Sequence, residues 1–546
     1  MTAREMTSTA AQEWIAHDPD PRTAAELLEC TDADLDERFA QPLRFGTAGL
    51  RGPLRGGPNG MNLAVVLRAT WAVAKVLKDR GLHGRHVVVG RDARHGSDEF
   101  ALAAAEVLAA QGFSVLLMFT AVPTPIVAFA VRHGGAVAGV QITASHNPPA
   151  DNGYKVYFDD GFPIVPPVDQ EIERAMADAP HADEIPRRAV TPSGVDEVQR
   201  YVERAAQVRH THGSVRVAIT PLHGVGGEFV LDAMVRAGFT DVHVVDSQFA
   251  PDPDFPTVAL PNPEDPGATD ALLKLAAEVD ADIAVALDPD ADRCAVGVPT
   301  PDGWRMLSGD ETGWLLGDYI LSQVEPGPVM AATVVANSLV SSRMLAAIAA
   351  EHGACHVETL TGFKWLARAD LDLPGCTLVY AYEEAIGHCV DPPSVRDKDG
   401  ISAAVLVCDL AVALRRRGHT LLDALDDLAR RHGVHTTVAA SRQVADVGEA
   451  EAMMDRLRTS PPEVLAGFDV TLTDLRHATG PLCTDAVILS GGGGQTTIRV
   501  VVRPSGTEPK VKSYIEVRCG DVGDVGEARL RAEMLAAEVK RDAQRW

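Results

Sequence analysis

Three stretches of the chain repeat one arrangement of apolar and polar residues. Apolar runs at 86–90, 215–220 and 329–335 each enter a turn containing Gly, Ser or Asn and then a helical pattern that ends in Gly. Short apolar runs that alternate with helical patterns predict a mostly parallel sheet with helices packed on it. The runs begin roughly 115–130 residues apart, which is about one domain each. We therefore expect three similar α/β domains with mixed sheets.

The C-terminal section has a different pattern. Alternating stretches at 496–502 and 511–517 predict strands, and an amphipathic stretch at about 527–540 predicts a final helix. We expect a smaller α+β domain there. The four glycines at 491–494 lie between strand-like segments and no helix follows them, so we interpret them as a flexible turn rather than a phosphate-binding loop.

The chain divides into five segments on this interpretation. Its first residues are polar and helix-forming, with Asp and Pro breaks. The expected segments are an N-terminal helical extension (1–40), domain 1 with a candidate serine (41–208), domain 2 with an acidic motif (209–325), domain 3 (326–435) and domain 4 (436–546).

The chain is strongly acidic. Its formal net charge is −26 and its pI is about 5.1, which argues against nucleic acid or an anionic membrane as a partner. An anionic substrate would therefore need a local basic pocket. The eight cysteines form no CxxC pair, and no apolar run approaches the roughly 18–20 residues of a membrane helix. We expect a cytoplasmic protein with reduced thiols.

One serine lies in a turn between an apolar run and an Asn-Pro break. The run VAGVQI leads into TASHNPP at 143–149 and then DNGYK at 151–155. A hydroxyl placed there is exposed and fixed, and His146 and Lys155 are close enough in sequence to act as proton acceptors or phosphate partners. The motif therefore favours a functional Ser145, although a capping serine in an ordinary Asn-Pro turn gives the same pattern.

Three aspartates at alternate positions follow another apolar run. Asp288, Asp290 and Asp292 point to one side if the segment is extended. Clustered like charges need a cation, and oxygen ligands favour Mg²⁺, Mn²⁺ or Ca²⁺. An EF-hand is excluded because Arg293 and Pro299 occupy the positions that need Gly and Glu. The pattern predicts a metal site; a solvated acidic loop is the alternative.

A third motif, RPSGTEPK, follows the strand-like stretch at 496–502. Its arginine, hydroxyls and glycine-exposed backbone amides form a good phosphate receptor, whereas a plain hairpin turn would not need them together. The candidate phosphate-binding residues are Arg503, Ser505, Gly506, Thr507 and Lys510.

Two adjacent glutamates follow the apolar stretch at 377–381. Glu383 and Glu384 precede a glycine, and carboxylates in such a place suit sugar hydroxyls as acceptors. A charged segment, RDKDG, follows at 396–400. Paired acids are common on protein surfaces, so this motif alone is weak.

Taken together and in order, these motifs closely resemble the α-D-phosphohexomutase superfamily of phosphoglucomutases and phosphomannomutases. The phrases TASHNPPADNGYK, DPDADR and RPSGTEPK carry the resemblance, which runs from FGTAGLRG at 45–52 to the C-terminus. The TAG spelling of that first motif and the EEAIG loop are most similar to the branch with phosphoglucomutase-2 and phosphopentomutases. The resemblance implies four domains around a central cleft, three of them α/β and the fourth smaller.

The resemblance also implies residue roles. Ser145 would be carried as a phosphoserine, and its phosphate would complete a Mg²⁺ site held by the three aspartates. The expected catalytic residues are Ser145, Lys155, Arg51 and His146, with Lys155 as a general acid or base. Arg293 would neutralise phosphate charge beside the metal, and the 503–510 loop would grip the distal phosphate. The expected sugar-binding residues are Glu383, Ala385, His388 and Lys398.

The implied activity is that of an isomerase acting on small phosphosugars. Such a mutase interconverts 1-phosphates with 6-phosphates, or with 5-phosphates, through a phosphoserine and a sugar bisphosphate. It needs Mg²⁺ and a bisphosphate activator such as glucose 1,6-bisphosphate. We expect phosphoglucomutase/phosphomannomutase activity, with phosphopentomutase as the alternative, in a monomer or homodimer.

Two departures from the family pattern bear on the sugar. Ala385 stands where the family usually has Ser, so a hydroxyl contact to the sugar is missing, and His388 lies one residue further on than in phosphomannomutases. The bulkier Ile386 beside Ala385 could shorten the pocket and favour a five-carbon sugar.

Two rival functions account for less of the sequence. A haloacid-dehalogenase-type phosphatase would use Asp288 as its nucleophile, but this leaves Ser145 and the Arg503 loop unexplained. A sugar-phosphate-binding pseudo-mutase would not need the complete set of chemical residues. Phosphate on Ser145 would separate both from a mutase, since neither requires it.

Overall fold

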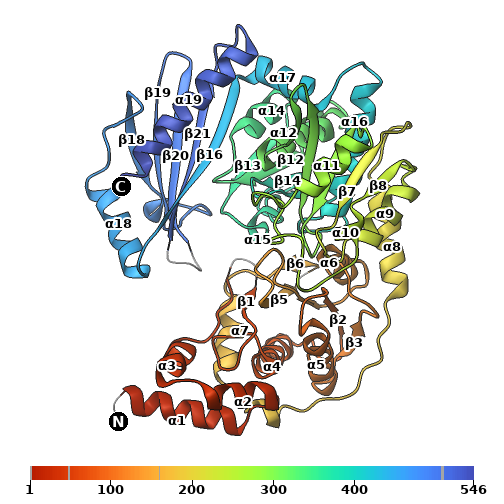
Figure 1. Cartoon of the computed structure of the whole chain (residues 1–546), viewed down its shortest axis with the longest axis vertical. Coiled ribbons are helices and arrows are strands. Elements are labelled where there is room, and N and C mark those ends of the chain that lie inside the picture. Colours follow the sequence, from red (N-terminus) through yellow and green to blue (C-terminus); the bar gives the residue numbers. More distant parts are fainter. Residues whose placement is uncertain (1–2, 47–48, 159, 506–509) are drawn as a thin grey trace. The chain divides into compact units, whose positions relative to one another are not determined.

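The chain folds into two compact units. A computed structural model describes residues 3–46, 49–158, 160–505 and 510–546. The first unit comprises Met1–Met306 and Gly387–Asp409, and the second comprises Leu307–Ile386 and Leu410–Trp546. The predicted mixture of α/β sheets is confirmed within these units (Figure 1).

Three short helices form the N-terminal extension. Asp20 accepts a hydrogen bond from the N–H of Arg22, and Thr31 and Asp34 form a reciprocal capping box. The Asp and Pro breaks in the sequence therefore mark helix starts. The helices are α1 (Ala3–Ala16), α2 (Pro21–Glu29) and α3 (Asp32–Ala40).

The first sheet has the strand order β1-β5-β4-β2-β3, with β6 beside β5. Strand β2 is parallel to β3 and β4, whereas β5 is antiparallel to β4 and β1. All five residues of β4 are buried, which explains its continuous apolar run. The strands are β1 (Leu50–Pro53), β2 (His86–Arg91), β3 (Ser114–Leu117), β4 (Ala138–Ile142), β5 (Asp151–Phe158) and β6 (Phe162–Pro163).

Helices on both sides of this sheet complete the first domain. Helices α5 and α6 contact its central strands, and α4 packs on α5 and α7. The helical elements are α4 (Leu63–Asp79), α5 (Ser97–Ala110), α6 (Thr124–His133), α7 (Val168–Ala177), the 3₁₀ turn η1 (Ala182–Glu184) and α8 (Val195–Ala206).

The second sheet has the order β11-β10-β9-β7-β8. Strand β7 is parallel to β8 and β9, while β9, β10 and β11 are antiparallel. Its elements are β7 (Val217–Thr220), α9 (Gly227–Arg236), β8 (Val242–Val244), α10 (Asp246–Phe249), α11 (Asp270–Glu278), β9 (Ile283–Leu287), β10 (Cys294–Thr300) and β11 (Gly303–Met306). The first unit also contains β15 (Gly387–Cys389) and the start of α16 (Gly400–Arg415).

The second unit begins with a parallel sheet in which β12 lies between β13 and β14. Helices α12 and α14 pack on each other, and each contacts a strand of this sheet. The elements are α12 (Gly309–Ser322), α13 (Pro328–Ala331), β12 (Thr333–Ser338), α14 (Met344–His352), β13 (Cys355–Thr359), α15 (Phe363–Leu366), β14 (Thr377–Glu383) and α17 (Leu421–His432).

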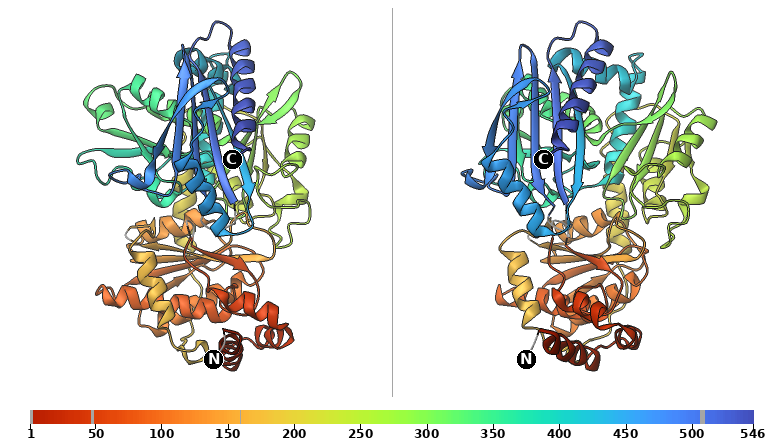
Figure 2. Two further views of the ribbon diagram at one scale, coloured as in Figure 1. Left: turned by 90° about the vertical axis from the view of Figure 1, so that its left-hand side faces the viewer. Right: turned by 60° about the vertical axis from the view of Figure 1, so that its left-hand side comes forward.

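The C-terminal domain is an antiparallel sheet of order β16-β21-β20-β19-β18-β17. Helix α19 (Val525–Ala543) lies along β16 and β21, as both ribbon views show (Figures 1 and 2). This confirms the predicted α+β domain. Its other elements are β16 (Val434–Gln443), α18 (Val447–Thr459), β17 (Val464–Leu465), β18 (Phe468–Asp474), the 3₁₀ turn η2 (Leu475–His477), β19 (Val487–Gly493), β20 (Thr496–Pro504) and β21 (Lys510–Cys519).

Two local predictions are wrong. The run at 329–335 is not one strand, because Pro328 begins the helical turn α13 and β12 starts only at Thr333. The first three of the four glycines are not a flexible turn but the end of β19. A side chain on Gly491 would place its Cβ 2.2 Å from the carbonyl oxygen of Asp469, so close approach between strands explains that glycine.

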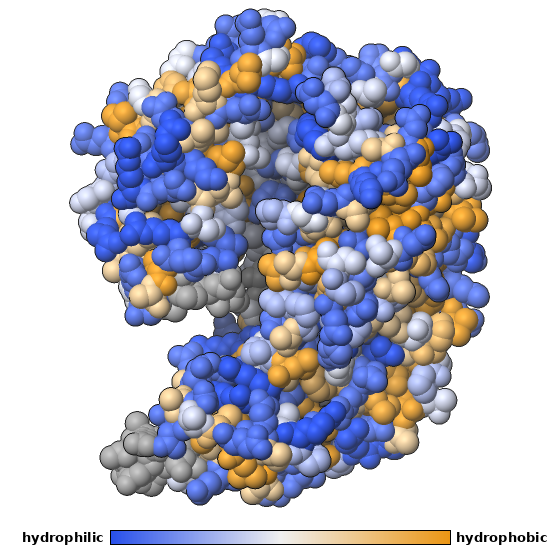
Figure 3. All heavy atoms as spheres, in the orientation of Figure 1, coloured by the Kyte–Doolittle hydropathy of each residue, from blue (hydrophilic) through white to orange (hydrophobic). Residues whose placement is uncertain are grey.

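One face of the surface is drawn by hydropathy in Figure 3. On the face drawn in Figure 3, hydrophilic residues predominate and apolar ones are scattered. Among the described residues, no helix is both long and apolar enough to cross a membrane.

Candidate active site

The turn after β4 holds Ser145 in an unusual backbone conformation. Its φ is +54°, in the left-handed region, which costs of order 1–3 kcal/mol and persists only where surrounding contacts impose it. The Ser145 N–H donates to Thr143 Oγ1 at 2.8 Å. The residue is 1% exposed, so the expectation of an exposed serine is wrong in this structure. Its hydroxyl faces Asp288, with Oγ 2.8 Å from Oδ2.

The acidic motif is a turn rather than an extended segment. Ala291 has a φ of +54°, and the chain reverses between β9 and β10. The three carboxylates therefore lie together because the chain turns here, and not because alternate residues of a strand point to one side. The predicted convergence is nevertheless observed, because ligand oxygens of the three buried aspartates all lie within 4.8 Å of one another.

Three other segments hold the backbone of this turn. Its carbonyls accept hydrogen bonds from the N–H groups of Val225 (2.8 Å), Thr124 (2.9 Å) and Gly400 (3.1 Å). The approach is close: a Cβ on Gly400 would lie 2.3 Å from the carbonyl oxygen of Arg293. The position of the carboxylates is thus fixed by packing and main-chain bonds.

The aspartate cluster fits a hard divalent cation. Within the described part of the chain, Asp290 Oδ1 and Asp292 Oδ1 are buried and have no hydrogen-bond partner. Buried carboxylate oxygens without partners are costly, and a cation with oxygen ligands would satisfy them. Burial, and then the charges of Asp290 and Asp292, raise the pKa of Asp288 well above its ordinary value.

Basic side chains surround the cluster. Lys155 Nζ, from β5, donates to Asp290 Oδ2 at 2.6 Å and to Asp292 Oδ2 at 2.8 Å. Burial alone would lower the pKa of Lys155, but these two carboxylates raise it, so the lysine is protonated. Lys398 Nζ lies 3.2 Å from Asp292 Oδ2, and Arg293 Nε lies 3.9 Å from Asp292 Oδ1. These three cations provide the local positive charge that an anionic substrate requires.

His146 and Arg51 also reach the serine turn. His146 Nδ1 lies 3.3 Å from Ser145 Oγ, and burial, together with the charges of Arg293 and Arg51, holds its pKa well below the ordinary value. The imidazole is therefore neutral near pH 7 and able to accept a proton. Arg51, on β1, donates to Asn147 Oδ1 at 3.2 Å.

Sequence reasoning missed several contributors to this site. Thr124, at the start of α6, donates its hydroxyl to Asp290 Oδ2. Tyr157 donates to Asp397 Oδ2 at 2.9 Å, and Asp397 lies 3.5 Å from Lys398 Nζ. Arg94 bonds to the serine turn itself. A single Thr, Tyr or Arg forms no recognisable spacing pattern in the sequence. Only the position of these residues in turns or on strands near the motifs could have pointed to them.

In the second unit, the paired glutamates have different surroundings. Glu384 Oε2 accepts hydrogen bonds from the hydroxyls of Ser338 and Ser341, both at 3.0 Å, so it is a structural residue. Glu383 ends β14 and is 7% exposed, and Ala385 is partly exposed. Of the two acids, Glu383 is the better candidate for a sugar.

Two neighbouring residues are buried deeper than the sugar hypothesis assumed. Ile386 is 2% exposed with a φ of +53°, so its side chain packs inward in this structure. His388, on β15, is fully buried, and burial lowers its pKa to about 3. Neither presents a surface to a ligand here, and we leave both out of the proposed sugar contacts.

The phosphate motif lies at the end of the β20–β21 hairpin. The Ser505 N–H donates to the carbonyl of Lys510 at 2.8 Å and closes the turn, and Arg503 lies opposite Lys512. Among the atoms that the structure describes, Arg503 Nε is buried without a hydrogen-bond partner. The predicted residues Gly506 and Thr507 lie outside the described residues.

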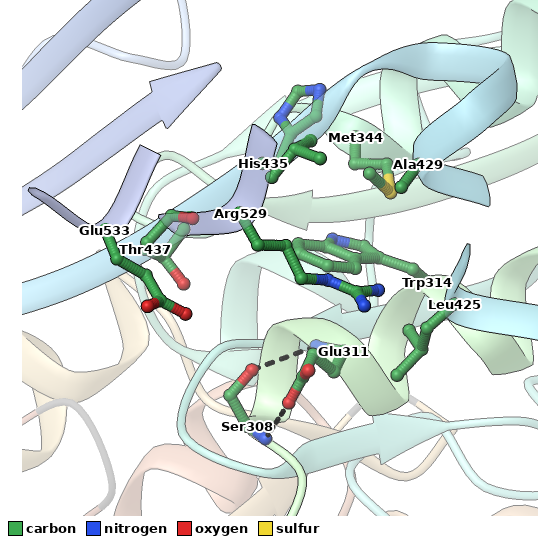
Figure 4. A pocket seen from close by; sticks show the side chains of 12 residues that line it. Ser308, Glu311, Trp314, Met344, Leu425, Ala429, His435, Thr437, Arg529 and Glu533 are labelled. Atoms are coloured by element: carbon green, nitrogen blue, oxygen red, sulfur yellow. Dashed lines mark hydrogen bonds between the residues drawn. The ribbon is translucent and has the colours of Figure 1, made fainter. Parts of the chain in front are cut away.

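A separate cavity of about 200 Å³ in the second unit contains none of the predicted site residues. Figure 4 shows Trp314 and Arg529 across its middle, with His435 and Met344 on one side. The imidazole of His435 is held by Glu516, with Nδ1 2.8 Å from Oε1. Its lining residues come from α12, α14, α17, β16 and α19 and from the residue before α12, and we assign it no chemical role.

Comparisons with known proteins identify the family of this chain. Models of phosphoglucomutase/phosphomannomutase alpha/beta/alpha domains I, II and III match residues 42–182, 199–303 and 308–432. A probable phosphomannomutase of Haemophilus influenzae is 38% identical, covering 85% of this chain and 94% of that protein. A mouse phosphopentomutase is 33% identical, covering 98% of this chain and 93% of its own.

Solved structures show the same fold. The crystal structure of a putative phosphomannomutase from Thermus thermophilus superposes with a TM-score of 0.68 at 24% identity, covering 91% of this chain and 99% of that one. The three domain matches and the long, similar relatives together establish that this chain belongs to the phosphoglucomutase/phosphomannomutase family of the α-D-phosphohexomutase superfamily, whose members are phosphomutases and thus isomerases.

Proposed function

We propose that this protein moves a phosphoryl group between two hydroxyls of one sugar, with Ser145 as the carrier and Mg²⁺ on the aspartate cluster. One observation carries the proposal: Ser145 Oγ lies 2.8 Å from a carboxylate of a three-aspartate cluster in which two buried oxygens have no hydrogen-bond partner among the described residues. A bound Mg²⁺ would neutralise charge that develops on the transferred phosphoryl group.

The chain's own residues account for proton movement and charge. When Ser145 receives a phosphoryl group, the P–O bond to the sugar oxygen breaks and Oγ forms the new one; the proton of Oγ passes to neutral His146, and protonated Lys155 gives a proton to the sugar oxygen. When the phosphoserine donates, the same transfers run in reverse: a sugar hydroxyl gives its proton to Lys155 as it forms the new P–O bond, the P–O bond to Oγ breaks, and His146 returns a proton to Oγ. We assign the acid–base work at the sugar to Lys155, and phosphate neutralisation to Arg293 and Arg51.

The hairpin at 503–510 would bind the phosphate that is not reacting. Arg503, Ser505 and Lys510, with the residues between them, offer charge-assisted bonds to a phosphate. After the first transfer the sugar carries two phosphates and must turn around, and the same hairpin can hold whichever phosphate is distant. A sugar bisphosphate such as glucose 1,6-bisphosphate would prime Ser145.

We propose glucose and mannose 1- and 6-phosphates as substrates, with pentose phosphates as the second candidate. Relatives named phosphomannomutase, phosphopentomutase and phosphoglucomutase are each at least 30% identical to this chain. The pentose alternative is supported by the mouse phosphopentomutase, which aligns over 98% of the chain. We also propose that the enzyme works as a monomer or homodimer in the cytoplasm.

The decisive test is intact mass after incubation with Mg²⁺ and glucose 1,6-bisphosphate. The parent protein should gain one phosphoryl group and lose it to added phosphosugar, whereas Ser145→Ala should do neither and should lose turnover. Rates on glucose, mannose and ribose phosphates, measured with the bisphosphate present, would then rank the sugars. Near-normal turnover by Ser145→Ala would contradict the proposal.

A further inference from the structure

One buried arginine grips the backbone of the serine turn. Arg94 follows β2, and its side chain is 1% exposed. Its guanidinium donates to the carbonyl oxygens of Ser145 (2.6 Å), Asn147 (2.6 Å), Pro148 (2.7 Å) and Asp151 (3.0 Å). Four carbonyls from one short loop thus converge on a single planar group.

The guanidinium is itself held rigidly. Its Nε lies 3.5 Å from Asp92 Oδ2, and Asp92 Oδ1 accepts bonds from Ser97 Oγ (2.6 Å) and the Arg94 N–H (3.0 Å). The ring of Phe255 lies 5.1 Å from Arg94 Cζ, within the range of a cation–π contact. The arginine therefore acts as a fixed template and not as a mobile side chain.

This template explains how Ser145 keeps its strained backbone. A residue with a Cβ leaves the left-handed region unless neighbouring contacts impose it. The Arg94 bond to the Ser145 carbonyl, together with the bond from Ser145 N–H to Thr143, fixes both peptide groups beside the serine. These bonds aim Oγ at Asp288 and His146.

We infer that Arg94 is a positioning residue for phosphoryl transfer: its four bonds to the serine turn hold Ser145 Oγ in line with the aspartate cluster. Arg94 bonds to main-chain oxygens of the turn and to Asp92, not to the three aspartates. A lysine keeps the positive charge, but as a point donor it lacks the planar fork that reaches four carbonyls. The inference rests on the proposed role of Ser145.

Arg209 offers a matched control in the same unit. Its side chain is 9% exposed and donates to the carbonyls of Thr211 (2.7 Å), Ala237 (2.5 Å) and Gly213 (2.5 Å), and its guanidinium lies 3.9 Å from the ring of Phe239. Its carbonyl partners belong to none of the predicted site loops. Arg209→Ala therefore removes a similar set of bonds and measures the cost to stability alone.

The test compares Arg94→Lys, Arg94→Ala and Arg209→Ala in the full-length enzyme. Displacing a reacting atom by about 1 Å costs roughly 100-fold in rate, so Arg94→Ala should lose about that much kcat while KM changes less than about threefold. Arg94→Lys should lose about tenfold. Phosphorylation of Ser145 by glucose 1,6-bisphosphate should slow in parallel, while Mn²⁺ affinity, read by electron paramagnetic resonance, should stay unchanged. Millimolar guanidinium should partly restore Arg94→Ala but not Arg209→Ala.

Three results would overturn the inference. The first is a kcat of Arg94→Lys within about threefold of the parent. The second is an equal loss of kcat in Arg94→Ala and Arg209→Ala at matched stability. The third is that guanidinium restores the activity of Arg94→Ala and Arg209→Ala to the same extent. If Arg94→Ala does not fold, Arg94→Lys decides. Ser145→Ala, assayed alongside, separates the two claims: turnover by that variant contradicts the phosphoserine, whereas an active Arg94→Lys contradicts only the positioning role.

Discussion

Around the aspartate cluster of the first unit, Ser145, Lys155 and Thr124 are buried and bond to the aspartates, whereas in the second unit Arg503 and Ser505 lie at a hairpin end and are partly exposed. Asp290 illustrates the first arrangement: it is fully buried and receives bonds from Lys155 and Thr124. Arg503 illustrates the second: the residue is partly exposed, and in the described structure its buried Nε has no hydrogen-bond partner.

The difference follows from the work that each region would do. A centre where bonds break gains from groups fixed before the substrate arrives, because reorganisation then adds nothing to the barrier. A phosphate-binding region that must accept two orientations of one intermediate benefits from being accessible to solvent. Substitutions in the first region should therefore lower kcat, and substitutions in the second should mainly affect substrate binding.

The largest effect is expected for Asp290→Asn. The amide keeps the shape of the side chain but removes one of three charges on the metal cluster, so turnover should fall about a thousand-fold or more. Steady-state kinetics across a Mg²⁺ titration measure this, and EDTA should abolish activity of the parent until Mg²⁺ is restored. Asp310→Asn, a buried aspartate of α12, is the matched control and should keep its activity. Full activity of the parent in EDTA would refute the metal site.

Asp310 and Asp290 are both buried but their pKa values shift in opposite directions, and this predicts how stability depends on pH. Burial raises the pKa of Asp310 to about 7, whereas Lys155 lowers the pKa of Asp290 despite burial. A raised native pKa means that the folded state holds the proton more tightly, so this contribution to stability is complete below about pH 4 and is lost as pH rises toward 7. The loss should be about 2–4 kcal/mol.

Denaturant unfolding of the full chain at pH 5 and pH 8 measures this loss. Asp310→Asn keeps an acceptor for the N–H of Ser342 and the hydroxyl of Tyr382, so it should fold, and its stability should change less over that range. Identical pH dependence in variant and parent would show that Asp310 is ionised in both states.

Arg503→Ala tests the binding side of the comparison. A charge-assisted bond contributes roughly 1.5–3 kcal/mol, so kcat/KM should fall about ten- to a hundred-fold. Affinity for Mn²⁺ should not change, because Arg503 is not one of the three aspartates that would hold the ion. Arg442→Ala removes an exposed arginine from the neighbouring strand β16 and should leave kinetics intact. An unchanged kcat/KM in Arg503→Ala would remove this hairpin from the site.

The sequence predicted most of the fold because buried strands and amphipathic helices leave periodic signals. The runs at 86–90 and 215–220 became β2 and β7, and the final helix lies where its pattern placed it. The run at 329–335 failed because the helical turn α13, begun by Pro328, is itself apolar. Composition alone does not distinguish one turn of helix from a strand.

The site was predictable where its residues cluster in sequence. The aspartates were found from their spacing, although a turn with Ala291 in the left-handed region, and not a strand, brings them together. Arg94 was missed because its partners are backbone carbonyls that begin 51 residues later, and such bonds leave no pattern of side chains. Positive φ values at Ser145 and Ile386 were equally hidden, because neither residue type favours them.

The smallest effect is expected at the sugar loop, for Ala385→Ser. Glu384 is held by two serines and Glu383 is nearly buried, so the partly exposed Ala385 is the position where a new hydroxyl can reach a ligand. One hydrogen bond contributes roughly 0.5–1.5 kcal/mol, or about tenfold in discrimination. That is too little to exclude a hexose, since Glu383 and the two proposed phosphate-binding regions, at Ser145 and at 503–510, remain. It is enough to relax selection at one hydroxyl. The parent should therefore use glucose phosphates and also measurably use mannose or ribose phosphates.

In Ala385→Ser, the ratios of kcat/KM among these sugars should shift by up to about tenfold, while Ala354→Ser, beside β13, should leave them unchanged. Strict glucose specificity in the parent, or ratios in Ala385→Ser that match the parent, would show that this position does not select the sugar.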